Sequence, residues 1–141
     1  MFNKILVPVD LSSPEPGVRS CPRARKLAEM FNADVLLLTV LPGYSMPMVA
    51  SFFPEDAIKK AEAESLQKLQ ALGREYFATP PETSICSGKR AKEILQKAEE
   101  WGADLIVFGC RPKDMLGGEL QLGSCGTAVS ERARCSVLVA R

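Results

Sequence analysis

The chain has 141 residues, of which 46% are hydrophobic and 25% charged, and its formal net charge is +1. These values fit a globular protein and exclude a disordered chain, and the near-neutral charge gives no general attraction for nucleic acid. No apolar run is long enough to cross a bilayer, so we expect no membrane insertion. The five cysteines form no C-x-x-C pair, which favours a reducing, cytoplasmic location. The absence of histidine excludes Ser-His and Cys-His catalytic sites and the usual zinc sites.

The first half of the chain predicts two buried strands and two helices. Residues 4–10 and 34–40 are short, continuous apolar runs, which are typical of strands covered on both faces. Apolar residues at helical spacing predict a helix within residues 18–31, in which Pro22 either produces a kink or lies in the first turn. A longer amphipathic helix is predicted over about residues 55–76.

The second half predicts three more strands, at 82–87, 104–109 and 136–140, and two helices, at 91–101 and 123–134. The 82–87 run is short and alternating, so we expect it at an edge of the sheet. Alternating strands and helices predict an α/β fold, in which a five-stranded parallel sheet carries helices on both faces. Right-handed crossovers favour the strand order 3-2-1-4-5.

This strand order predicts a ligand-binding crevice between the first and fourth strands. The chain reverses its direction of travel there, and ligands of open α/β sheets bind above the carboxyl ends of the strands at such a point. Asp10 and Gly109 lie at those two ends. Gly123 and Ser124 begin the following helix, whose unpaired N–H groups attract anions such as nucleotide phosphates. The alternative to a phosphate-binding role is that the residues from Gly109 to Ser124 form only an ordinary strand–loop–helix connection.

Four segments in this order and spacing resemble the universal stress protein family over essentially the whole chain. They are Ile5–Asp10, Ala33–Val40, Ala103–Gly109 and Leu122–Val139. The resemblance implies a single domain over residues 1–141 with a Rossmann-like fold of the adenine nucleotide alpha hydrolase-like type. It also implies ATP or AMP as the ligand, with Mg²⁺ or Mn²⁺ accompanying the phosphates.

Members of that family bind nucleotide through a motif of the form G-x2-G-x9-G-[S/T]. The resemblance assigns Gly109 to its first glycine and Gly123 with Ser124 to its closing pair. Pro112 occupies the second glycine position, and the spacer from Lys113 to Leu122 is one residue longer. Proline removes a backbone donor that a phosphate oxygen would otherwise use, although some members carry an Arg-Pro pair here.

Two polar groups have alternative roles. Asp10 either accepts a hydrogen bond from a ribose hydroxyl or caps the following helix. Gly123, Ser124 and Cys125 offer N–H groups to phosphate, and Ser124 adds a hydroxyl, unless Ser124 is only the cap of its helix.

As in the family, Pro8, Val9 and Val40 are expected to form the adenine slot, and packing in the core is the alternative role of these side chains. Arg111 and Lys113 either supply charge to phosphate or are solvated loop cations.

These features predict a nucleotide-binding regulatory protein of the stress response, acting through a nucleotide-sensitive loop and a dimer surface. Strand Val137–Ala140 is expected at a sheet edge, and similar proteins pair it with the same strand of a second subunit. We therefore expect a homodimer. A regulatory role also implies a protein partner, whose identity is unknown. The acids of the loop form no recognisable catalytic arrangement, so no catalytic residue is assigned. The alternatives are a dimeric interaction protein that has lost nucleotide binding and a slow ATPase.

Overall fold

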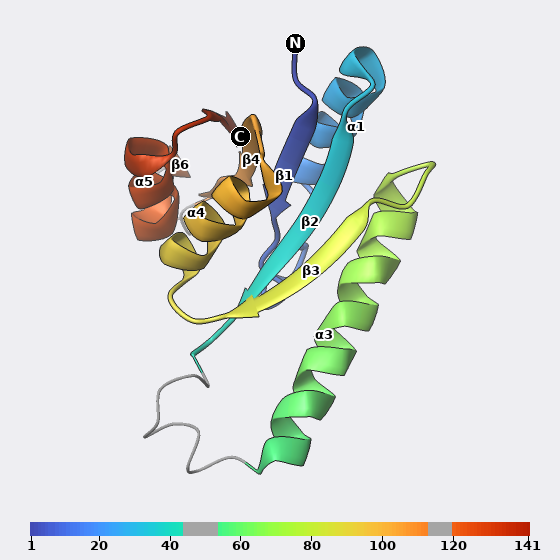
Figure 1. The fold of residues 1–141 in the computed structure, drawn as a ribbon, viewed down its shortest axis with the longest axis vertical. Coiled ribbons are helices and arrows are strands. Elements are labelled where there is room, and N and C mark those ends of the chain that lie inside the picture. Colours follow the sequence, from blue (N-terminus) through green and yellow to red (C-terminus); the bar gives the residue numbers. More distant parts are fainter. Residues whose placement is uncertain (44–53, 113–119) are drawn as a thin grey trace.

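A computed structural model of the chain describes residues 1–43, 54–112 and 120–141. Its main sheet has five parallel strands in the order β3-β2-β1-β4-β7 (Figure 1). Their bounds are Lys4–Pro8 (β1), Asp34–Leu41 (β2), Glu82–Ser87 (β3), Leu105–Gly109 (β4) and Ser136–Ala140 (β7). The predicted order 3-2-1-4-5 is confirmed, and so is the edge position of the strand at 82–87.

Helices cover both faces of this sheet. The described helices are α1 (Ser20–Phe31), α3 (Glu55–Tyr76), α4 (Arg90–Trp101) and α5 (Gly123–Arg132). Side chains of β1 alternate between two buried clusters: Ile5 and Val7 pack with α1 and α3, and Leu6 packs with α4 and α5. Figure 1 shows α3 on one side of the sheet and α4 with α5 on the other. Burial on both faces is the reason that the strand sequences are continuously apolar.

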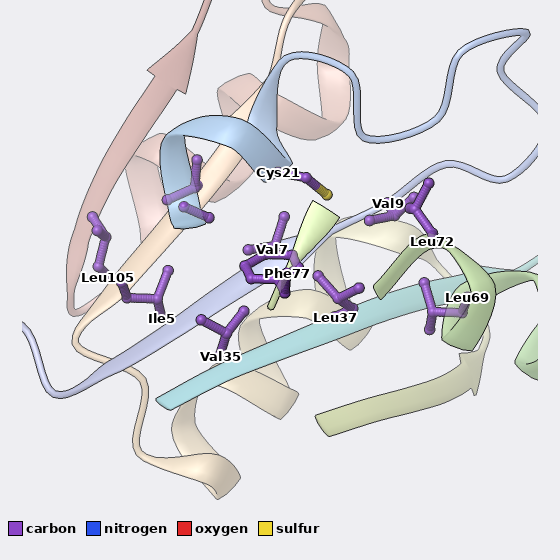
Figure 2. Packing of buried hydrophobic residues seen from close by; sticks show 12 residues of the cluster. Ile5, Val7, Val9, Cys21, Val35, Leu37, Leu69, Leu72, Phe77 and Leu105 are labelled. Carbon is purple, nitrogen blue, oxygen red and sulfur yellow. The ribbon is translucent and has the colours of Figure 1, made fainter. Parts of the chain in front are cut away.

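The cluster beneath α1 and α3 is shown in Figure 2, where side chains of β1 and β2 lie among those of the two helices. Cys21 of α1 is fully buried there, and burial raises the pKa of its thiol from 9.0 to about 12. Cys21 therefore serves as a small apolar core residue. None of the described helices combines the length and the apolarity needed to cross a membrane.

The segment after β1 delays the first helix. Residues 11–19 form turns and bends, and α1 begins only at Ser20. Pro22 thus lies in the first turn, where a missing N–H leaves no helical hydrogen bond unmade. Of the two alternatives for Pro22, the position in the first turn is correct.

Two very short strands were not predicted. Arg111–Pro112 (β5) pairs antiparallel with Leu120–Gln121 (β6), with Arg111 opposite Gln121. A two-residue strand that contains proline carries no recognisable strand signal, because proline cannot donate to a ladder. The pairing holds together the two ends of the spacer between β4 and α5. Residues 113–119, which include Lys113, lie outside the described residues.

The carboxylate of Asp104 fastens the beginning of β1 to the beginning of β4. It accepts hydrogen bonds from the backbone N–H groups of Asn3 at 2.8 Å and Lys4 at 3.1 Å. The ammonium group of Lys4 in turn donates to the carbonyl of Trp101 at 3.0 Å and lies 5.1 Å from the centre of its ring. These contacts join β1 to the turn that follows α4.

Replacing Asp104 with alanine should lower the free energy of unfolding by about 1–3 kcal/mol, because two backbone donors lose a charged acceptor. Urea unfolding measures the change. Asp34→Ala is the matched control, since Asp34 is an exposed carboxylate at the beginning of the neighbouring strand β2. Equal effects of the two substitutions would contradict the role assigned to Asp104.

Candidate functional site

A cavity of about 710 Å³ lies at the carboxyl ends of β1, β2 and β4. Turn residues 13–19 and the first residues of α4 and α5 complete its wall. The chain reverses its direction of travel between β1 and β4, so the cavity lies at the position where open α/β sheets bind ligands. Its volume is within the range of about 300–1,000 Å³ that is usual for small-molecule sites.

Eight of the ten residues predicted to bind nucleotide line this cavity: Pro8, Val9, Asp10, Val40, Gly109, Gly123, Ser124 and Cys125. They come from three strand ends and one helix, as the predicted crevice required. Of the other two, the backbone of Arg111 belongs to β5, whereas its side chain and the whole of Lys113 lie outside the described residues. The geometry thus gathers most of the predicted site, while the binding roles stay predictions.

The backbone at the ends of β1 and β2 is held by two hydrogen bonds. The N–H of Val9 donates to the carbonyl of Leu38 at 2.8 Å, and the buried hydroxyl of Thr39 donates to the carbonyl of Val9 at 2.7 Å. Thr39 was not singled out from the sequence. Its hydroxyl fixes the position of Val9 beside Val40, so the apolar part of the wall is rigid.

Asp10 is fixed by its own turn and by a cation. Its Oδ1 accepts hydrogen bonds from the N–H of Ser12 at 3.0 Å and from the hydroxyl of Ser12 at 2.6 Å. Its Oδ2 lies 3.4 Å from Nη2 of Arg90. The alternative that Asp10 caps the following helix is wrong, because α1 begins at Ser20 and Arg19 is its N-cap. Asp10 instead presents an anchored carboxylate to the cavity.

The beginning of α5 provides the donors of the site. The N-cap is Leu122, without a side-chain hydrogen bond at the cap, and Gly123 with φ of 77° is the first helical residue. Ser124 is therefore the second residue of the helix, and the alternative that it is only the cap is wrong. The N–H groups of Gly123, Ser124 and Cys125 belong to the first turn, where a helix supplies them with no carbonyl partner. These three residues line the cavity, so the positive end of the helix dipole faces it.

Two arginines of the cavity wall were missed from the sequence. Arg19 precedes α1, and Arg90 is the first residue of α4. The sequence contained one signal for Arg90: the first turn of a helix favours acidic residues, so a cation there requires a nearby anion. That anion is Asp10. The lining of the cavity therefore combines charged with apolar residues.

Cys125 is partly buried at the beginning of α5. Burial raises the pKa of its thiol, and the positive charge of Arg90 opposes this change. Arg90 thus lines the same cavity as Asp10 and Cys125.

The whole chain, residues 1–141, matches the model of the universal stress protein family. It is 32% identical to universal stress protein YxiE of Bacillus subtilis over the full length of both chains. It is 30% identical to universal stress protein MJ0531 of Methanocaldococcus jannaschii, over 100% of this chain and 83% of that protein.

Solved structures of universal stress proteins have the same fold. One from Archaeoglobus fulgidus superposes with a TM-score of 0.74 at 23% identity over the whole of both chains. Another from that organism, in complex with dAMP, gives 0.70 at 22% identity, with 99% of this chain and 98% of that one covered. A universal stress protein in complex with cAMP gives 0.67 at 23% identity, with 99% and 97% covered. Sequence and fold agree: this chain belongs to the universal stress protein family.

Proposed function

We propose that this protein is an adenine-nucleotide-binding regulatory protein of the stress response, with ATP or AMP as its ligand. The observation that carries the proposal is a single cavity that is lined both by Asp10 and by the first turn of α5. An acceptor for ribose and donors for phosphate are thereby combined beside an apolar slot. The universal stress proteins that were solved with dAMP and with cAMP support the assignment, since both ligands contain adenine and phosphate.

Each part of the nucleotide has a matching group in the cavity. A ribose hydroxyl donates to the Asp10 carboxylate, and the adenine ring lies against Pro8, Val9 and Val40. Phosphate oxygens accept hydrogen bonds from the first N–H groups of α5 and from the hydroxyl group of Ser124. The phosphate roles of Arg111 and Lys113 stay predictions.

The described residues contain no group of three or more acids, cysteines or histidines that would hold a metal ion. Mg²⁺ or Mn²⁺ accompanying the phosphates stays a prediction, and none of the described residues is assigned to it. Asp10 and Glu15 are the acids among the described lining residues, and Asp10 is assigned to ribose. We propose binding without efficient hydrolysis, because a positioned water, a base and metal ligands are needed for phosphoryl transfer.

Gly123→Leu should lower the affinity for ATP at least about tenfold, because its side chain enters the space assigned to phosphate. An added Cβ at Gly123 meets no atom within 4 Å, and the positive φ of 77° adds strain of about 1–2 kcal/mol. Titration calorimetry measures binding, and thermal unfolding measures stability. The matched control is Gly102→Leu, since Gly102 has a φ of 76° and equally open surroundings but does not line the cavity.

A second candidate function is a dimeric interaction protein that has lost nucleotide binding. Pro112 favours it, because a proline in β5 has no N–H to offer a phosphate. Mass spectrometry of ligand released from the purified protein separates the two candidates. If no nucleotide co-purifies and millimolar ATP produces no heat, the nucleotide proposal is wrong and the second candidate stands.

ATP should protect Cys125 from alkylation by iodoacetamide, because Cys125 lines the proposed phosphate site. The raised pKa of Cys125 keeps the reactive thiolate scarce at neutral pH, so labelling should be slow there and accelerate as the pH rises. Peptide mass spectrometry follows the rate. Cys135 is the control, since it is also partly buried with a raised pKa but lies outside the cavity. Equal labelling of Cys125 with and without ATP would oppose the proposed phosphate position.

A homodimer is also proposed. β7 pairs with β4 along five residues, and its other edge has no partner within the described part of the chain. Val137, Leu138 and Val139 along it are half-buried. Light scattering during gel filtration should give twice the chain mass of 15.3 kDa. A monomer at micromolar concentration would oppose the pairing of β7 with a second copy.

A further inference from the structure

Arg90 lines the main cavity together with Asp10 and the first turn of α5. It forms an ion pair with Asp10, with Nη2 at 3.4 Å from Oδ2, and its charge acts on Cys125 at the beginning of α5. Arg90 and Asp10 line both the main cavity and a smaller adjoining one of about 290 Å³. The pair thus stands at the boundary between these spaces.

The two partners of the ion pair differ in their exposure. The side chain of Arg90 is 45% exposed, so its guanidinium group can turn toward a ligand, whereas Oδ2 of Asp10 is buried. Oδ1 of Asp10 accepts two hydrogen bonds from Ser12, and Oδ2 is the oxygen that lies 3.4 Å from Nη2 of Arg90. Because Oδ2 is buried, a ribose hydroxyl can reach it only if neighbouring atoms such as the guanidinium group move aside.

The position of Arg90 on its helix also favours an additional anion. Arg90 is the first residue of α4, where the positive end of the helix dipole disfavours a cation. A phosphate beside Arg90 would meet the guanidinium group and the positive ends of two helices, α4 and α5. Guanidinium binds phosphate with paired, charge-assisted hydrogen bonds, which a single lysine cannot reproduce.

We propose that Arg90 binds the phosphate attached to the ribose, exchanging its contact with Asp10 for that phosphate while Asp10 accepts the ribose hydroxyl. This inference rests on the proposed function. It assigns to Arg90 the discrimination between a phosphorylated nucleoside and an uncharged one. The phosphate nearest the ribose is selected because Arg90 pairs with Asp10, the proposed ribose acceptor, and lines the same cavity as the first turn of α5.

Calorimetric titration of adenosine and of AMP into wild-type protein and Arg90→Gln tests the assignment. The wild type should bind AMP more tightly than adenosine. Arg90→Gln should lower the affinity for AMP about tenfold or more, with a much smaller effect on adenosine, because one charge-assisted contact is lost. Arg134→Gln is the matched control: Arg134 pairs with Glu99 at 3.3 Å but lies outside both cavities, so neither affinity should change.

A second variant, Arg90→Lys, keeps the charge but not the planar fork, and its preference for AMP should be intermediate. Thermal unfolding verifies that each variant is folded. If both Arg90 variants keep the full wild-type preference for AMP, the assignment of Arg90 is wrong while the proposed function stands. If the wild type binds neither AMP nor ATP, the proposed function is wrong and the assignment of Arg90 is wrong with it.

Discussion

The double-sided burial of β1 is the constraint on which the rest of this structure depends. Ile5, Leu6 and Val7 are completely inaccessible to solvent, since alternate side chains face the helices of opposite layers. The buried positions of such a strand cannot carry a charge, because a buried charge without a partner is strongly unfavourable. The first acidic side chain after the strand is Asp10, where the chain leaves the core. The position of the carboxylate is thus a consequence of the packing of the sheet.

The same constraint explains why the strands and their order followed from the sequence. Continuous apolar runs such as 34–41 are possible only where both faces are covered, and the more polar 82–87 run lies at the edge. Once the strands alternate with helices, right-handed connections leave few arrangements. The crevice between Asp10 and Gly109 then follows from topology alone. No contact between individual side chains was needed to locate it.

The parts that failed depended on local backbone geometry or on contacts between distant side chains. Capping by Asp10 was wrong because Pro14 and Pro16 disfavour helical backbone in the residues before them, so the chain turns until Ser20. The pairing of β5 with β6 involves only two residues on each side, too few for a periodic pattern. Arg90 was missed because its partner Asp10 is distant in sequence. Only its unfavourable place at a helix N-terminus marked it.

Pro112 and Arg90 together bear on how a phosphate would be held. The family motif has a glycine where this chain has a proline in β5, so one backbone donor is absent from the spacer. The described donors then belong to the first turn of α5, supplemented by the guanidinium group of Arg90 on the adjacent helix. A flexible cation beside fixed N–H groups can approach a phosphate without any change in the backbone. Its ion pair with Asp10 holds that cation beside the end of β1, so a positive charge is present at the cavity wall.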